Sequence, residues 1–424
     1  MKYSIITVLF IALSFSIKAQ HLDKLYKNPT INLVAESHFG DNNNWDKIFE
    51  TYYDTTWYGK AIGKRKSLIV LEDGTIIVNN MYHNYYSKFA PNGNFIGEFG
   101  VTKKDGTQFK KTEPIYGYIG NTLYTGANNM GEVLFFDFNG NYKKSLKLNY
   151  SVRQIITLSD TKLAVVGWSI WKDRFRDFVA IVDYNTSKQT IIWEHFTKKN
   201  EDKMFNYTYQ FNDKNNESNG TKISITTMPF SKYTGMSIPP VINRIKDKLI
   251  IAIPSTGEII TFDKYGKRLS TLTIDWAKNS ISIEEQKKIQ RRALAKYKSI
   301  DTLVKGVSNS ENKKAKNTLI REMEADLNKI NKAIPIPVFS TVIKDSDENL
   351  LFFEISRKDN DNKFNVWILS GRGEFKYQSS FKCKDYNLEI TPKKLFFYNG
   401  YLYSLQTRKG ITKNPLRLVK FKLK

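Results

Sequence analysis

Histidine and acidic side chains are the first candidates for chemistry in this sequence, because a metal-dependent enzyme needs imidazole or carboxylate ligands gathered at one place. The chain has 424 residues and only 4 histidines, at His21, His38, His83 and His195. Two acidic stretches, 345–349 (D-S-D-E-N) and 359–362 (D-N-D-N), resemble pieces of calcium loops but lack the glycine and the distal glutamate of an EF-hand. We therefore predict no metal site and no cofactor.

Nucleophilic catalysis has an equally small set of candidates. Cys383 is the single cysteine, so no disulfide can form within the chain, and it stands near Phe381 in a strand-like stretch without a neighbouring histidine. The sequence contains no G-x-S-x-G, no H-E-x-x-H and no phosphate-binding loop. We assign no catalytic residue, and the pattern favours a binding protein over an enzyme.

Recognition chemistry is better represented, because aromatic, arginine and asparagine side chains gather in segments that connect predicted strands. Aromatic rings and guanidinium groups carry much of the affinity at binding sites. The alternative is that loops are generally polar and that these aromatics pack against the rest of the chain. The candidate ligand-binding residues are Tyr82, Asn84, Asn128, Trp168, Trp171, Arg174, Arg176 and Arg408.

The strands that must position these segments come from a repeated unit. Residues 133–142 (V-L-F-F-D-F-N-G-N-Y) read as an apolar strand, an F-D-x-x-G turn and the start of the next strand, with Asn139 and Gly140 as positive-φ residues of a tight hairpin. Similar turns recur, and a second strand with its own turn precedes each copy. The spacing of about 40–50 residues is the period of a four-stranded propeller blade. The sequence predicts an all-β fold, a six-bladed β-propeller over 66–424.

The two ends of the chain carry separate predictions. Residues 1–19 have a basic Lys2, an apolar run and a small residue at Ala19, which is typical of a cleaved signal peptide; an uncleaved anchor is the alternative. The run is short for a transmembrane span, so we expect a periplasmic or secreted protein. The last blade lacks an outer strand before Lys424, and within the N-terminal segment 20–65 we expect a strand at 31–38 to complete it.

Two insertions interrupt the repeat. Residues 197–237 are rich in Asn, Lys and Gly and predict a long loop with at most a hairpin. Residues 275–334 contain a capping box at 282–285 and two apolar stripes, which predict a helical hairpin between blades four and five. Strand parity places both insertions on the face that carries the candidate loops. We expect the helical insertion to act there as a lid or docking surface.

The architecture and the F-D-x-x-G turns resemble the six-bladed β-propeller families of exported bacterial proteins, of the TolB-like and NHL-like kind. The resemblance covers about 66–424 without the insertions, and most members of this group are uncharacterised. It implies binding of proteins or peptides, as in the better-known relatives. Some NHL-like relatives are hydrolases or lyases with an axial calcium or zinc ion. The alternative function is therefore a metal-dependent hydrolase or lyase of the lactonase type, with Asn80 and Asn128 as neutral ligands.

The charge balance indicates the class of partner. The chain has 66 Lys and Arg against 42 Asp and Glu, a net charge of +24, which attracts anions over a long range. Export and the scattered position of the basic residues argue against nucleic acid. An anionic glycan, lipopolysaccharide or an acidic protein at the cell envelope fits better, although the lysines could serve solubility alone. We expect a monomeric binding protein that uses the loop-bearing face.

Overall fold

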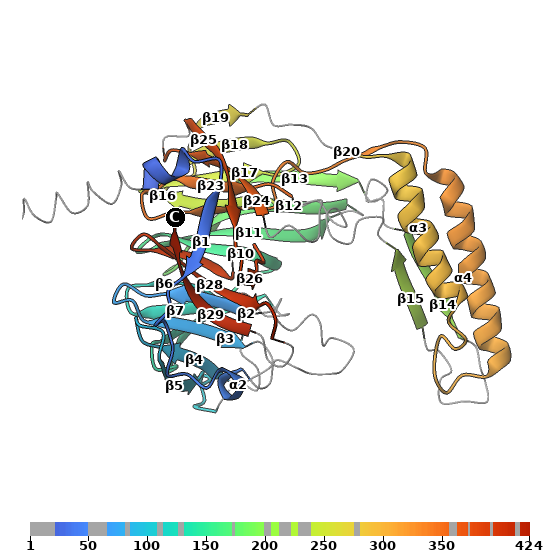
Figure 1. The fold of residues 1–424 in the computed structure, drawn as a ribbon, viewed down its shortest axis with the longest axis horizontal. Helices are drawn as coiled ribbons and strands as arrows, with labels where there is room; N and C mark the ends of the chain where they lie inside the picture. Colours follow the sequence, from blue (N-terminus) through green and yellow to red (C-terminus); the bar gives the residue numbers. More distant parts are fainter. Residues whose placement is uncertain are drawn as a thin grey trace, which may run out of the picture.

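The fold was obtained as a computed structural model. It describes residues 22–49, 66–80, 85–107, 113–125, 131–171, 174–198, 205–211, 222–227, 239–274, 280–355, 363–371, 374–390, 393–411 and 416–424. Antiparallel strands dominate these segments (Figure 1). In this part of the chain no helix is long and apolar enough to cross a membrane. Candidate residues Tyr82, Asn84 and Asn128 lie outside the described segments, as does the expected signal peptide.

Four sheets of four strands follow one another along the chain, each with neighbouring strands in sequence order. The first contains β2 (Lys66–Val70), β3 (Ile76–Asn80), β4 (Tyr85–Phe89) and β5 (Phe95–Gly100). The second contains β6 (Ile115–Ile119), β7 (Thr122–Thr125), β8 (Glu132–Asp137) and β9 (Tyr142–Lys147). The third contains β10 (Ser151–Ser159), β11 (Lys162–Trp171), β12 (Arg174–Asp183) and β13 (Gln189–Lys198). The fourth contains β16 (Val241–Ile245), β17 (Lys248–Ile253), β18 (Glu258–Asp263) and β19 (Arg268–Thr273).

The remaining large sheet has nine strands and joins the two ends of the chain. One part contains β22 (Thr341–Lys344), β23 (Leu350–Phe353), β24 (Lys363–Leu369) and β25 (Phe375–Lys382). The other contains β26 (Tyr386–Asn387), β27 (Leu395–Tyr398), β28 (Tyr401–Arg408) and β29 (Leu416–Leu423). Strand β1 (Ile31–Ala35) links them: it pairs antiparallel with β29, Leu33 opposite Leu423, and parallel with β25, Ile31 opposite Phe381.

The first strands of the sheets contact one another in a closed path, from β2 through β6, β10, β16, β22 and β27 back to β2. Side chains alternate between the two faces of a strand, so a strand between two sheets must be apolar on both. In β11, Val165 packs in the cluster that contains Phe135 of the preceding sheet, and Val166 packs with Ile251 of the following one. The fold is thus mostly β and built of propeller-like blades, as predicted.

The F-D-x-x-G turn has a different backbone from the expected one. Gly140 has a φ of +87°, whereas Asn139 is not among the residues with positive φ. The Asp137 carboxylate accepts hydrogen bonds from the amides of Asn139 at 2.9 Å and Asn141 at 3.0 Å, and the register between β8 and β9 shifts between Phe135 and Phe136, just before the turn. The turn therefore needs one residue with positive φ, which is Gly140, and a β-bulge. The aspartate favours this turn because its carboxylate accepts hydrogen bonds from the backbone amides within it.

Short helical segments precede β2. Residues 22–26 form a helical turn, and α2 (Trp45–Ile48) begins after Asn44, whose side chain accepts a hydrogen bond from the amide of Lys47. Trp45 stacks on Phe89 of the first sheet at 6.0 Å between ring centroids. The segment before the first sheet is thus packed against the ring.

Two helices follow β19 and β20 (Ser280–Ile281), as predicted: α3 (Ile283–Lys298) and α4 (Asn309–Lys329). Ser282 caps α3 by accepting a hydrogen bond from the amide of Glu285 at 3.2 Å, and Ser308 caps α4 in the same way. Strand β20 pairs with β21 (Ile334–Pro335), so the insertion leaves and returns at one point.

The insertion before β16 also folds, as a hairpin of β14 (Phe205–Gln210) and β15 (Lys222–Thr227). It packs against the helices rather than against a blade: Tyr207 shares a cluster with Leu294 and Met323, and its hydroxyl accepts a hydrogen bond from Gln290 Nε2 at 2.7 Å. We call α3, α4, β14 and β15 the satellite module. Figure 1 shows its elements side by side, at one end of the molecule.

Candidate functional site

A cavity of about 630 Å³ lies on the axis of the ring, because residues from every strand of the closed inner path line it. Its walls are largely apolar, with Ile69, Ile156, Val342, Leu395 and Phe396 among them. The volume lies in the range of about 300–1,000 Å³ that is typical of small-molecule sites. We therefore take it as a candidate binding site.

Cationic and aromatic side chains meet near the start of the inner strands. The Lys393 ammonium lies 4.7 Å from the centre of the Tyr116 ring, and the Tyr116 hydroxyl donates to the carbonyl of Arg153 at 2.9 Å. The Arg153 guanidinium in turn lies 5.5 Å from the Trp168 ring. We call these four residues, Tyr116, Arg153, Trp168 and Lys393, the cationic mouth. They come from β6, β10, β11 and the segment before β27, so only the assembled ring brings them together.

The charges of the lining are unbalanced. The lining contains four basic residues and one acidic residue: Arg153, Arg244, Lys344 and Lys393 against Asp345. Arg153 Nε lies 3.6 Å from Asp177 Oδ1, and Lys344 pairs with Glu348 at 2.6 Å. Neither Lys393 nor Arg244 has an acidic partner within the described segments. The low dielectric of a partly closed cavity strengthens the attraction of such cations for an anion.

Hydrogen bonds between sheets hold the inner strands in place. Gln154 Nε2 donates to the carbonyl of Ile242 at 2.8 Å, while its Oε1 accepts from the amide of the same residue at 3.0 Å. Asn243 Nδ2 donates to the carbonyl of Val342 at 3.2 Å. These bonds join β10 to β16 and β16 to β22, so the shape of the cavity is preformed.

A second cavity of about 330 Å³ continues the first toward the turns that follow the inner strands. Both cavities are lined by Ile69, Tyr116, Ile156, Arg244 and Phe396. The second also has Glu72 and Asp160 in its lining, from the turns after β2 and β10. The two cavities therefore adjoin each other, and the second has both acidic and basic residues in its lining.

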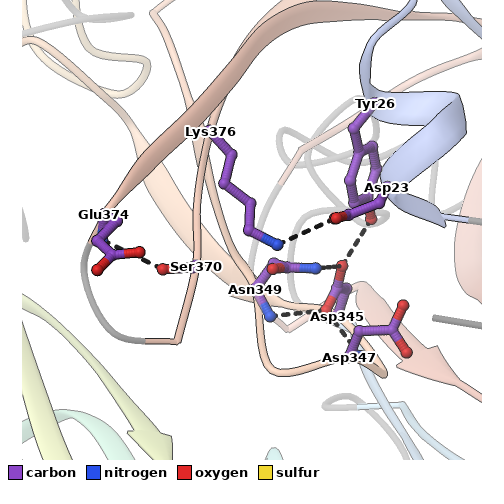
Figure 2. Close-up of polar contacts among 8 residues, drawn as sticks. All are labelled: Asp23, Tyr26, Asp345, Asp347, Asn349, Ser370, Glu374 and Lys376. Atoms are coloured by element: carbon purple, nitrogen blue, oxygen red, sulfur yellow. Dashed lines mark hydrogen bonds and ion pairs between the residues drawn. The ribbon is translucent and has the colours of Figure 1, made fainter. Parts of the chain in front are cut away.

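Asp345 directly follows β22, and its carboxylate attaches the N-terminal segment to the ring (Figure 2). Tyr26 donates its hydroxyl proton to Asp345 Oδ2 at 2.8 Å, and Asn349 Nδ2 donates to the same oxygen at 2.9 Å. The amides of Asp347 and Asn349 each donate to Oδ1 at 2.8 Å. Burial raises the pKa of Asp345 and of Tyr26. The stretch that resembles a calcium loop therefore closes a turn and binds a tyrosine.

Replacing Asp347 by Asn should flatten the pH dependence of stability. Burial, and then the charges of Asp345 and Asp23, raise the pKa of Asp347 to about 6, although Lys376 opposes this. A carboxyl whose pKa is higher in the folded state than its ordinary value of about 3.9 stabilises the fold fully at low pH, and that contribution is lost as the pH rises through 6. Urea midpoints between pH 4.5 and 7.5 measure the loss, which we expect to be roughly 1 kcal/mol after solvent screening of a half-exposed group.

The matched control for this variant is Asp247→Asn, since Asp247 is exposed on the equivalent turn of the fourth sheet. It should leave the pH profile unchanged. The pKa of Asp345 is also raised, so the Asp347→Asn variant should keep part of the dependence of stability on pH. An unchanged slope in Asp347→Asn would contradict the assignment.

The predicted site residues do not all converge. Trp168 pairs in register with Asp177, so these two share a face of the third sheet, and Arg176 is on the other face. There the Arg176 Nε and Nη2 atoms donate to Glu194 Oε2 at 2.8 and 2.6 Å. Arg174 is exposed at the start of β12, and Arg408 is exposed in a different sheet, at the end of β28. Trp171 ends β11, and its side chain is outside the described part.

Tyr116, Arg153 and Lys393 are not among the residues predicted from the sequence, because they stand at the beginnings of inner strands, whereas most of the predicted residues belong to connections between second and third strands. A usable signal existed: Arg153 is a cation at the start of a strand whose later residues are apolar. Such a residue must either reach solvent or face a cavity.

No group of three or more His, Cys, Asp or Glu side chains is arranged to hold a metal ion within the described ranges. His195 stacks on Trp193 at 6.4 Å, and His38 lies 3.1 Å from the Asp41 carboxylate. His83 and Asn128 fall outside those ranges. Cys383 is buried, and burial raises the pKa of its thiol.

Comparison with known proteins finds no matching family model and no matching curated protein. Among solved structures, a member of the DUF4221 family from Bacteroides vulgatus is 12% identical over 94% of this chain and 99% of its own, with a TM-score of 0.49. A putative exported protein from Bacteroides fragilis is 9% identical over 84% of this chain and 89% of its own, with a TM-score of 0.44. Virginiamycin B lyase from Staphylococcus aureus is 11% identical over 86% of this chain and 97% of its own, with a TM-score of 0.39.

Proposed function

We propose that this protein is an exported binding protein that takes an anionic ligand at the cationic mouth of its axial cavity. The observation that carries the proposal is the presence of Arg153, Lys393 and Tyr116 in the lining of one cavity, where the Lys393 ammonium lies over the Tyr116 ring and the Tyr116 hydroxyl donates to the Arg153 carbonyl. A guanidinium group can donate two parallel hydrogen bonds to a carboxylate, sulfate or phosphate, and an ammonium adds a second charge. The net charge of +24 would steer such a ligand toward the protein.

We also infer that the ring has six blades. The nine-stranded sheet counts as two of them, because β1 supplies the strand that separates β25 from β29. The closed path of inner strands supports this count, since it visits β22 and β27 as separate members. Each blade then contributes one inner strand to the axial cavity.

The compartment narrows the choice of ligand and partner. The signal-like segment 1–19 supports export, where an anionic glycan or an acidic protein of the cell envelope is available and nucleic acid is not expected. The mouth stands at the starts of the inner strands, which antiparallel order places on the face of the loops between second and third strands. We therefore propose that ligand enters from the face that carries the satellite module.

The test is isothermal titration of the protein with anions at two salt concentrations. A uronic-acid oligosaccharide, an acidic peptide and small carboxylates form the panel. Charge-driven binding should weaken as salt rises, and the double variant Arg153→Gln with Lys393→Gln should bind at least tenfold more weakly, because charged hydrogen bonds are worth about 1.5–3 kcal/mol.

The matched control is Lys420→Gln. Lys420 also lies over an aromatic ring, 4.0 Å from the centre of Tyr401, but on β29 and outside the cavity lining. It should leave affinity unchanged. The proposal fails if no anion binds, or if the double variant binds as well as the unaltered protein.

A further inference from the structure

We propose that the ligand is an amphiphilic anion, with one carboxylate, sulfate or phosphate at the cationic mouth and an apolar body inside the axial cavity. This inference rests on the proposed function, because it assumes that the mouth binds the charged group. It goes further by stating what occupies the cavity below that group. A polar anion such as an acidic sugar is the competing occupant.

The walls below the mouth offer mainly hydrocarbon. Ile69, Ile156, Val342, Leu395 and Phe396 belong to the lining, and they come from four of the inner strands. When an apolar group moves from water into this space, the transfer stabilises the complex by about 25 cal/mol per Å² of apolar surface removed from water. A sugar ring would instead lose the hydrogen bonds that its hydroxyls make with water.

The polar side chains of the same walls are already engaged. Both ends of the Gln154 amide bond to the backbone of Ile242, and Asn243 Nδ2 donates to Val342. The Thr157 hydroxyl donates to the carbonyl of Tyr118 at 2.8 Å and lies 3.0 Å from the Tyr124 hydroxyl. These hydrogen bonds join neighbouring strands. The same groups could bind the hydroxyls of a sugar only if those bonds between strands were broken.

The cations of the lining stand at its ends rather than in its middle. Arg153 and Lys393 belong to the mouth, whereas Arg244 and Lys344 stand near the turns that end β16 and β22. At that far end Arg244 Nε donates to the carbonyl of Lys246 at 2.6 Å, and Lys344 pairs with Glu348. A single charged group at the mouth followed by an uncharged body matches this distribution.

The deciding experiment titrates the protein with straight-chain carboxylates from acetate to decanoate and with glucuronate. Each buried methylene contributes about 0.8 kcal/mol, so affinity should rise roughly two- to fourfold with each added carbon until the cavity is full. Glucuronate should bind no more tightly than acetate. Octyl sulfate and octyl phosphate, measured beside octanoate, show which anionic group the mouth prefers.

Two variants separate the cavity from the mouth. Ile156→Trp should fill the cavity and abolish the gain with chain length. Its control is Ile191→Trp, at an exposed position on β13 of the same sheet, where nothing should change. Arg153→Gln should lower the affinity for every carboxylate by the same factor and preserve the gain in affinity with each added carbon. Thermal melting confirms that each variant is folded, and the chain-length series on the unaltered protein decides the question even if one is not.

The outcomes distinguish the two proposals. If affinity is independent of chain length, or if glucuronate binds as tightly as octanoate, the amphiphilic ligand is ruled out while a charge-dependent mouth survives. If Arg153→Gln leaves octanoate binding unchanged, the proposed function itself is wrong.

Discussion

Deletion of all residues up to Asp41 should abolish cooperative unfolding of this protein. The deletion removes β1, whose Ile31 and Leu33 are buried and which pairs with both β25 and β29. It also removes Tyr26, which donates to Asp345, and the carbonyls of Asn28 and Pro29, which accept from Ser379 and Ser380. Two strand edges would open at once, and open edges favour aggregation. Thermal melting followed by circular dichroism measures the effect, and a deletion that melts like the intact chain would overturn the role of β1.

Single substitutions in β1 provide a finer test. Leu33→Ala should destabilise the protein by about 3 kcal/mol, because it leaves a cavity in the cluster that also contains Phe421. Val34 is the neighbouring residue on the opposite face and is 38% exposed, so Val34→Ala should cost less than about 1 kcal/mol. Urea unfolding of the two variants compares the cost of removing a buried side chain with the cost of removing an exposed one from the same strand. Equal costs would show that β1 stabilises the ring through its backbone alone.

Gly140→Ala should destabilise the second sheet by about 3 kcal/mol or more, the upper part of the range for single substitutions. Gly140 has a φ of +87°, and a Cβ atom there would lie 1.9 Å from the carbonyl oxygen of Gly100 in the first sheet. The strained φ costs about 1–2 kcal/mol, and the clash adds to it because the obstacle is backbone. The turn cannot simply move away, since its own carbonyl accepts a hydrogen bond from the amide of Thr102 at 3.0 Å.

Gly106→Ala is the matched control for this substitution. Gly106 has a nearly equal φ of +80°, but nothing lies within 4 Å of the Cβ position. It should cost only the strain of the left-handed conformation, about 1–2 kcal/mol. The difference between the two variants, measured by urea unfolding, isolates the contact between the first and second sheets. If the variants are equally stable, that contact is not tightly packed in solution.

The strands were predictable because a strand between two sheets must be apolar on both faces, and Val133–Phe136 shows that pattern without ambiguity. The helix at Ser282 was equally predictable, because its cap is a local motif. The satellite module was not, since its core joins Tyr207 to Leu294, and Tyr207 stands in an Asn-rich segment whose composition indicates a loop. Local signals identify elements, whereas contacts over a long sequence distance decide their partners.

The candidate site shows the same limit at the scale of one residue. Trp168 and Arg176 stand on adjacent strands, and only the register decides whether they share a face. A slip of one residue would exchange the faces, but the observed register pairs Trp168 with Asp177 and so separates it from Arg176. The sequence of the connection between β11 and β12 contains no turn motif that determines this register.

The satellite module has a consequence for how relatives of this protein can differ. Its core is shared between two insertions that enter the chain on either side of the fourth sheet, and Tyr209 of one also donates to Glu311 of the other at 3.2 Å. Neither insertion can cover its apolar surface alone. We therefore expect the two insertions to occur together in relatives, and a homologue that has one without the other should have polar residues at its apolar positions.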